Sequence, residues 1–214
     1  MNGAVATMAT PTAERAAPTV VLASASRIRA ELLRQAGVPV TVMAASIDEA
    51  EVKLSLRAAG AGAAAIAESL AELKAQQVSR KHSGGLVVGA DQVLACGDAL
   101  FDKPADIAAA RGQLLALRGR RHELLSAVVA VRDGTRLWHH VGRAALTMRD
   151  FSDTFLDAYL AEVGDAALTS VGAYQLEGRG AQLFAHIDGD YFTILGLPLL
   201  PLLDFLRENR VLPS

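Results

Sequence analysis

Residues 86–92, Leu-Val-Val-Gly-Ala-Asp-Gln, decide the fold, because a short apolar run leads directly into two polar residues. A continuous apolar run of this length is typical of a strand that is buried on both faces. It predicts that Asp91 lies at the carboxyl end of the strand, where open α/β sheets bind their ligands. A carboxylate at that place can bind a divalent metal or act as a general base. The competing interpretation is that Asp91 caps a helix or a turn.

Strands and helices are predicted to alternate on both sides of this stretch. Val20–Ala23 is an apolar run that precedes a helix beginning near Ile28, and Asp133-Gly134 is a strong hairpin signal between two strands. Further predicted helices cover 58–80, 105–117, 152–164 and 197–209, and further strands cover 38–44, 124–131, 136–148, 172–176, 183–187 and 191–195. This alternation favours an α/β fold with a mixed sheet.

The composition restricts the class of protein. A chain of 214 residues with 51% hydrophobic and 5% aromatic residues predicts one large domain, or a domain split into two lobes, with an aliphatic core. The net charge of −2 argues against a general nucleic-acid binder. Cys96 is the single cysteine, which excludes an intrachain disulfide and a cysteine-based zinc site and favours a reducing cytoplasm.

The first 18 residues are expected to differ in structure from the rest of the chain. Residues 1–18 are rich in Ala, Thr and Pro and lack the basic and apolar regions of a signal peptide, so they predict a flexible tail. Residues 19–214 are expected to form a single domain. No apolar run reaches the roughly 18 residues of a membrane span, so no membrane partner is expected.

A possible anion site follows the first strand, in residues 22–29. Small residues allow backbone amides to approach a ligand, and the start of the following helix favours a negative charge. Ser24 and Ser26 add hydroxyl groups, while Arg27 and Arg29 can neutralise phosphate. An ordinary serine cap beside solvated arginines explains the pattern equally well. The chain has no Walker loop.

Three weaker signals lie elsewhere in the chain. Asp48 and Glu49 are adjacent, so at most one is expected to point into a site, and a solvated acidic turn is the alternative. Lys103 directly precedes Pro104 and suits a phosphate, although most such lysines are exposed. Glu177 lies between glycines and can accept hydrogen bonds from a base edge, or it is a surface residue of a turn. The five histidines predict no metal cluster.

In this order and spacing the motifs resemble the Maf family, the septum-formation-inhibitor-like nucleoside triphosphate pyrophosphatases. The resemblance covers about residues 20–206. It rests on LASASRIRAELLRQAG, IDEAE, LAELKA, VVGADQV, FDKPAD, RGQLLALRGRRHE, VGAYQLEGRG and ILGLPL. The implied fold is a mixed, twisted sheet with flanking helices and two lobes around a deep cleft.

The resemblance also implies the roles of individual residues. Asp91 matches the catalytic carboxylate, and Glu49 matches the acidic residue that binds a divalent metal, Mg²⁺ or Mn²⁺, together with Asp91. The positions that match the phosphate-side residues are Ser24, Arg29, Lys74 and Lys103. Gln92 and Glu177 match the positions that set the base preference, and this pair is similar to the branch that acts on 7-methyl-GTP.

One departure concerns the loop 26–29, Ser-Arg-Ile-Arg, which has no proline and carries Ile28 where the 7-methyl-GTP branch has an aromatic residue. Ile28 packs against a base but does not stack as an indole does. Two alternatives therefore stay open. One is a dTTP/UTP pyrophosphatase, and the other is a non-catalytic regulator of septum formation that acts by protein contact.

The resemblance also implies how the reaction proceeds and which groups take part in it. Asp91 would deprotonate a water that attacks the α-phosphorus of a nucleoside triphosphate, and a nucleoside monophosphate and pyrophosphate would be the products. One divalent cation and several basic side chains would neutralise the triphosphate. The implied biological role is removal of modified nucleotides, and the implied oligomeric state is a homodimer.

Overall fold

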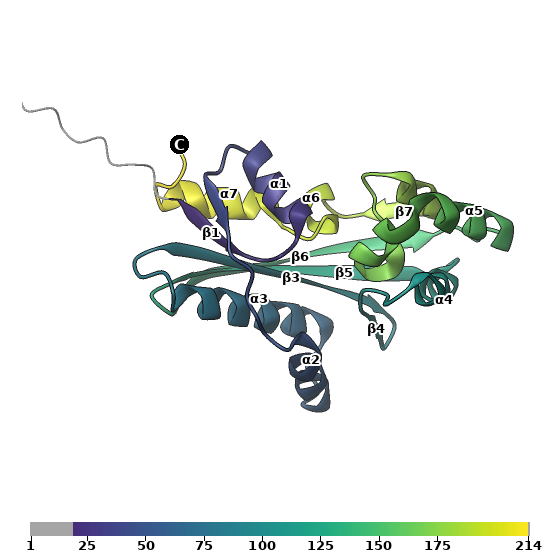
Figure 1. The fold of residues 1–214 in the computed structure, drawn as a ribbon, viewed down its shortest axis with the longest axis horizontal. Helices are drawn as coiled ribbons and strands as arrows, with labels where there is room; N and C mark the ends of the chain where they lie inside the picture. Colours follow the sequence, from purple (N-terminus) through teal and green to yellow (C-terminus); the bar gives the residue numbers. More distant parts are fainter. Residues whose placement is uncertain (1–18, 214) are drawn as a thin grey trace, which may run out of the picture.

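The computed structural model describes residues 19–213, in which strand β3 lies at the centre of a seven-stranded mixed sheet (Figure 1). The strands are β1 (Val20–Ala23), β2 (Val40–Val42), β3 (Leu86–Cys96), β4 (Ala99–Phe101), β5 (Arg121–Arg132), β6 (Thr135–Met148) and β7 (Phe184–Asp188). Their order is β2-β1-β3-β5-β6-β7, and β4 also pairs with β3.

Helices cover both faces of this sheet (Figure 1). The α-helices are α1 (Arg27–Gln35), α2 (Glu49–Ala58), α3 (Ala63–Ser79), α4 (Ile107–Leu117), α5 (Asp153–Val163), α6 (Tyr191–Ile194) and α7 (Leu199–Glu208). Three 3₁₀ helices, η1 to η3, cover Gly164–Thr169, Val171–Ala173 and Arg179–Leu183. The mixed sheet with flanking helices agrees with the predicted fold class.

One edge of β3 changes its partner along its length. The strand β1 pairs with it in parallel over residues 86–89, and β4 pairs with it antiparallel over residues 94–96. Among residues 19–213, no strand pairs with residues 90–93 on this edge, because β1 ends at Ala23, whereas β5 pairs with the opposite edge throughout this stretch. We call residues 90–93 of β3 the open edge.

The alternation of β3 side chains separates three hydrophobic clusters. On one face, Val88 belongs to a cluster with α1 and α7, while Leu94 belongs to a second cluster with α4 and α5 at the other end of the sheet. Val87 and Val93 point to the opposite face and pack with α3. Two lobes therefore share the long strands, and the open edge lies between them.

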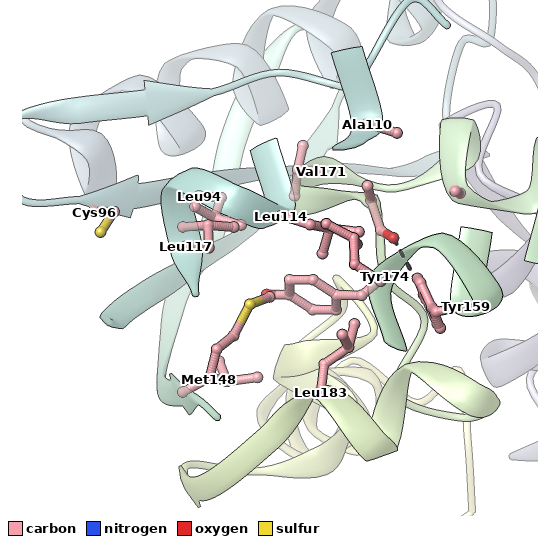
Figure 2. Close-up of a cluster of buried hydrophobic side chains, with 14 of the residues drawn as sticks. Leu94, Cys96, Ala110, Leu114, Leu117, Met148, Tyr159, Val171, Tyr174 and Leu183 are labelled. Atoms are coloured by element: carbon pink, nitrogen blue, oxygen red, sulfur yellow. Dashed lines mark hydrogen bonds between the residues drawn. The ribbon is translucent and has the colours of Figure 1, made fainter. Parts of the chain in front are cut away.

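The second cluster encloses polar aromatic groups as well as aliphatic ones (Figure 2). The hydroxyl of Tyr159 donates to the carbonyl oxygen of Ala173 at 3.2 Å. Nε2 of His122, which is buried, lies 2.9 Å from the hydroxyl of Tyr174. These contacts tie α5 and the segment 171–174 to the sheet.

The close approach of α3 to β3 depends on Gly89. A Cβ atom at this position would lie 2.0 Å from the carbonyl oxygen of Ala71 and 2.9 Å from the Cβ of Ala75. Only glycine fits this distance, so the helix axis lies close to the strand. The same turn of α3 thereby brings Lys74 to Asp91.

The predicted end of the central strand was wrong. Asp91 lies in the middle of β3, which continues to Cys96, and it caps neither a helix nor a turn. Two polar side chains are tolerated inside the strand because each has a hydrogen-bond partner, which is Lys74 for Asp91 and both Ser126 and α6 for Gln92.

Two other predicted strands are not strands. Residues 191–195 form α6, because the carboxylate of Asp190 accepts hydrogen bonds from the amides of Phe192 and Thr193 and caps the helix. Residues 172–176 begin in the 3₁₀ helix η2, and Gly172 adopts a φ of 78° there. Helix α2, where the sequence suggested an acidic turn, was not predicted.

Other expectations are confirmed. Asp133 and Gly134 have φ values of 50° and 77° and join β5 to β6, as a type I′ hairpin requires. The hydroxyl of Ser152 accepts the amide of Phe155 and caps α5. Helix α4 begins at Ile107, two residues later than expected, because Asp106 is its cap.

The predicted tail, 1–18, lies outside the described residues. Among residues 19–213, no helix is long and apolar enough to cross a bilayer.

Candidate active site

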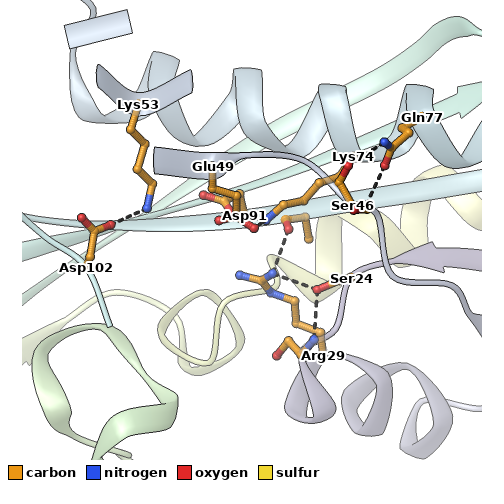
Figure 3. Close-up of polar contacts among 11 residues, drawn as sticks. Ser24, Arg29, Ser46, Glu49, Lys53, Lys74, Gln77, Asp91 and Asp102 are labelled. Carbon is orange, nitrogen blue, oxygen red and sulfur yellow. Dashed lines mark hydrogen bonds and ion pairs between the residues drawn. The ribbon is translucent and has the colours of Figure 1, made fainter. Parts of the chain in front are cut away.

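Two carboxylates meet around one lysine at the open edge (Figure 3). Nζ of Lys74 lies 2.6 Å from Oδ1 of Asp91 and 2.7 Å from Oε1 of Glu49. Asp91 is 5% exposed, and its other oxygen, Oδ2, is buried without a hydrogen-bond partner among residues 19–213. An unsatisfied buried carboxylate oxygen is rare in folded proteins, so Oδ2 is an acceptor that the described residues leave available.

Local capping places Glu49 at this point. The carboxylate of Asp48 accepts the amide of Glu51, so Asp48 is the N-cap of α2 and Glu49 is its first residue. The loop before α2 is fixed to α3, since Ser46 and Gln77 exchange two hydrogen bonds of 2.7 Å each. As predicted, only one of the adjacent carboxylates points into the site.

Arg29 is buried and has most of its donors occupied inside the protein. Its Nε donates to the carbonyl oxygen of Gly196 at 2.7 Å. Its Nη1 donates to Oγ of Ser24 at 3.1 Å and to the carbonyl oxygen of Ala90 at 2.8 Å. Burial lowers the pKa of Arg29, whereas the charges of Asp91 and Glu49 raise it. Only Nη2 makes no hydrogen bond within residues 19–213, so this nitrogen is the one left for a ligand.

Lys103 approaches from the other lobe, in the loop between β4 and α4. Partial burial lowers its pKa, and the guanidinium of Arg29 lowers it further. The carboxylate of Glu49 acts in the opposite direction. Lys103 is therefore close enough to feel these charges, although it is exposed and makes no hydrogen bond or ion pair within residues 19–213. Two carboxylates and two cationic side chains, Lys74 and Arg29, meet at the open edge.

The three residues predicted to set base preference lie on the other face of β3 or beyond it. Ile28 is half-buried and packs against the cluster of α1 and α7. Gln92 points away from Asp91 and toward α6. Glu177 is exposed and lies close enough to Tyr159 to raise the pKa of its phenol, although burial is the larger cause. Within residues 19–213, no hydrogen bond or ion pair joins these three side chains to one another.

Sequence reasoning missed two residues beside the site. Lys53 of α2 forms an ion pair with Asp102, the neighbour of Lys103, and so links the two sides of the open edge (Figure 3). The spacing of Glu49 and Lys53 is that of one helix face, which was not recognised because α2 buries no residue fully. Ser126, buried in β5 opposite Gln92, gave no signal in the sequence.

Two cavities lie away from these residues. One of about 210 Å³ is lined by Phe155, Ala158, Tyr159, Glu162, Arg179 and Gln182. Another of about 250 Å³ is lined by Ala95, Gly97, Arg121, His122 and Glu123. Neither contains a predicted site residue. At the open edge, the side chain of Lys74 fills the space between the carboxylates.

The donor set fits a divalent cation. Glu49 and Asp91 supply carboxylate oxygens, which are the ligands that Mg²⁺ prefers, and Oδ2 of Asp91 is unpartnered within residues 19–213. No group of three or more His, Cys, Asp and Glu side chains in that part of the chain could hold a metal. An ion at this place would therefore take its remaining ligands from phosphate and water, as Mg²⁺ commonly does.

Comparison with known proteins gives concordant results. The family model described as Maf-like protein matches residues 19–209. A protein of Paramagnetospirillum magneticum named nucleoside triphosphate pyrophosphatase is 61% identical over 189 residues, 88% of this chain and 97% of that protein. A protein of Brucella abortus named 7-methyl-GTP pyrophosphatase is 52% identical over 191 residues, 89% of this chain and 96% of that protein.

A crystal structure of a dITP/XTP pyrophosphatase from Mycobacterium abscessus aligns over 91% of this chain and 98% of that chain, with 17% identity and a TM-score of 0.41. The family match and the two relatives each span nearly all of the described residues. The chain belongs to the Maf-like protein family.

Proposed function

We propose that this protein hydrolyses the α–β phosphoanhydride of 7-methyl-GTP and releases 7-methyl-GMP and pyrophosphate, as part of the removal of modified nucleotides. Its relatives are named nucleoside triphosphate pyrophosphatases, and the chain is accordingly a hydrolase of this class. The observation that carries the proposal is the meeting of Asp91, Glu49 and Lys74 at the open edge.

Asp91 is the general base in this mechanism. Lys74 donates to Oδ1 and so holds the carboxylate in one orientation, while Oδ2 is left without a partner in residues 19–213. A water that donates to Oδ2 would lose its proton there as its oxygen attacks the α-phosphorus. A positioned base of this kind typically accelerates a reaction about 10²–10⁴-fold.

The cationic side chains bind the phosphates. Nη2 of Arg29 and the ammonium of Lys103 are the groups available on the two sides of the open edge, and Ser24 helps to fix the arginine. Charge-assisted hydrogen bonds from these groups stabilise the negative charge that develops on the leaving pyrophosphate.

Glu49 and Asp91 would hold a divalent cation, Mg²⁺ or Mn²⁺. When bound, such an ion supplies Lewis acidity and neutralises charge on the triphosphate. Loading the site requires the ammonium of Lys74 to share the two carboxylates with the cation.

Glu177 supports a guanine base. An ionised carboxylate only accepts hydrogen bonds, and the N1–H and exocyclic amine of guanine are both donors. Methylation at N7 adds a positive charge, which a carboxylate attracts. Thymine and uracil present one N–H between two carbonyl oxygens, which a carboxylate repels. The names of relatives such as the Brucella abortus protein support the same substrate.

A dTTP/UTP pyrophosphatase is the second candidate. It is favoured by Ile28, which packs against the cluster of α1 and α7 and offers no aromatic ring to a methylated purine. The expected homodimer and the cytoplasmic location stay predictions.

A substrate panel tests the proposal. Purified protein with Mg²⁺ or Mn²⁺ is given 7-methyl-GTP, GTP, dTTP, UTP and ATP at equal concentrations, and phosphate is measured by malachite green with and without inorganic pyrophosphatase. We expect phosphate only when the coupling enzyme is present, and the fastest rate with 7-methyl-GTP. Faster hydrolysis of dTTP or UTP would contradict the substrate, and phosphate release without the coupling enzyme would contradict the reaction.

A further inference from the structure

We propose that Ser126 is a positioning residue that holds the side-chain amide of Gln92 with its carbonyl oxygen toward the base, so that the site selects a base edge that donates hydrogen bonds. The inference rests on the proposed function, since it concerns how the same site recognises its substrate. It assigns a role to a buried hydroxyl that lies outside the group of charges around Asp91.

Ser126 lies directly opposite Gln92 in the pairing of β5 with β3. Its side chain lies on the same face of the sheet as that of Gln92, between the cluster of α1 and α7 and the cluster of α4 and α5. The residue is 0% exposed. Its Oγ accepts a hydrogen bond from Nε2 of Gln92 at 2.9 Å and donates one to the carbonyl oxygen of Thr193 at 2.7 Å. Both hydrogen-bonding functions of the hydroxyl are therefore used.

The partners of Gln92 determine which way its amide points. Nε2 also lies 3.2 Å from the carbonyl oxygen of Thr193 and 3.0 Å from that of Ile194. Backbone carbonyls only accept, so the group facing them must be the NH₂. The flipped amide would place Oε1 against two carbonyl oxygens and lose these hydrogen bonds.

Helix α6, which carries these two carbonyl groups, is itself held in place by contacts at both Asp190 and Gly142. Asp190 caps α6 through the amides of Phe192 and Thr193. Below it, Gly142 of β6 leaves room for Thr193, because a Cβ at Gly142 would lie 2.5 Å from Oγ1 of Thr193. These contacts hold α6 in the position from which the carbonyl oxygens of Thr193 and Ile194 accept from Gln92.

The remaining atom of the amide, Oε1, makes no hydrogen bond within residues 19–213 and is not buried. The segment that leads to Glu177 lies on the same face, because Gly172 approaches Leu94, two residues beyond Gln92. Both base-side residues then offer acceptors only. A guanine edge supplies two donors to such a pair, whereas inosine, which lacks the exocyclic amine, supplies one.

The matched variants Ser126→Ala and Ser79→Ala test the role. Ser79 is also buried, and its Oγ accepts one hydrogen bond, from the amide of Gly134, far from Gln92 in the fold. We expect Ser126→Ala to lower the ratio of kcat/KM for GTP over ITP, and for 7-methyl-GTP over UTP, by about threefold to tenfold, as loss of one hydrogen bond implies. The control Ser79→Ala should leave both ratios, and the kcat for GTP, unchanged.

A second readout is independent of turnover. In a ¹⁵N–¹H spectrum, the side-chain NH₂ of Gln92, assigned by its disappearance in Gln92→Met, should exchange slowly with water in the wild type and at least about threefold faster in Ser126→Ala. An unchanged exchange rate, or unchanged ratios in a protein that prefers guanine, would overturn the inference. A wild-type preference for UTP or dTTP would instead overturn the proposed substrate, and the exchange rate would then still decide the role of Ser126.

Discussion

The two oxygens of Asp91 have different surroundings, and this difference defines the chemistry at the scale of single residues. Oδ1 accepts from Lys74, while Oδ2 is buried with no partner in residues 19–213. An Asn at this position keeps an oxygen for Lys74 but carries no charge and does not accept a proton from water. An Asn at position 91 therefore keeps the shape of the side chain but removes its ability to act as a base.

We therefore expect Asp91→Asn to lower kcat by about 100-fold or more while the protein stays folded. The rate is measured with saturating nucleotide and metal, and the fold by circular dichroism and thermal unfolding. Asp98→Asn, in the exposed turn between β3 and β4, is the matched control and should retain full activity. Near-normal turnover of a folded Asp91→Asn protein would rule out Asp91 as the base.

The contribution of Glu49 to metal binding can be separated from its place in the helix. Glu49→Gln removes the charge that faces Lys74, so the Mg²⁺ concentration for half-maximal activity should rise about tenfold or more. Glu51→Gln, an exposed residue of the same first turn, should leave it unchanged. Full activity of the wild type in excess EDTA would show that no divalent cation is needed.

At the scale of elements, the sequence predicted a helix or turn correctly where the spacing of apolar residues and a local capping or turn residue indicated the same structure. The helix capped by Ser152 and the hairpin at Asp133-Gly134 needed only local signals. Helix α2 was missed because none of its residues is buried, so no apolar stripe marks it. The apolar residues 191–195 resembled a strand, and only the contact of Asp190 with two amides makes them a helix.

In the candidate site too, residues in local motifs were predicted, whereas contacts between residues far apart in the sequence were not. The resemblance of the motifs identified Asp91, Glu49 and Lys74, which the structure brings together. The pairings of Lys53 with Asp102 and of Ser126 with Gln92 join positions 49 and 34 residues apart. Such contacts depend on register and packing, which no local pattern of this sequence specifies.

The contact of α3 with β3 gives a prediction for these two elements. Gly89→Ala would place a methyl group 2.0 Å from the carbonyl oxygen of Ala71, so the helix must move away from the strand. We expect the free energy of unfolding to fall by about 1–3 kcal/mol, and activity to fall because Lys74 moves with the helix.

The control for this experiment is Gly85→Ala, whose Cβ would meet the nearest atoms at 3.5 and 3.6 Å, ordinary contact distances. It should change stability by no more than about 0.5 kcal/mol. Both properties are measured by urea unfolding and by initial rates. Equal stability of the two variants would mean that α3 adapts to the methyl group without loss.

At the scale of the whole molecule, His122 makes stability depend on pH. Burial lowers its pKa to about 4, below the ordinary value of 6.5. Below pH 6.5 the unfolded chain binds a proton that the folded chain does not, so stability falls as the pH drops from about 6.5 toward about 4. The unfolding free energy should therefore be about 2 kcal/mol lower at about pH 5 than at about pH 7.5 on account of this residue.

The variant His122→Gln isolates this effect, since glutamine does not titrate. Its own stability will be lower, but the difference between the two pH values should shrink by about 2 kcal/mol relative to the wild type. Urea unfolding of both proteins at the two pH values measures it. An identical pH dependence in the variant would show that other groups cause the loss.

The open edge of β3 also bears on how the molecule avoids aggregation. Unpaired strand edges are the usual templates on which a second chain adds a strand. Here the stretch without a neighbouring strand is only residues 90–93, with β1 and β4 flanking it, and Arg29 donates to the carbonyl oxygen of Ala90. An incoming strand of ordinary length would collide with both flanks, so a small ligand can enter where a neighbouring polypeptide cannot.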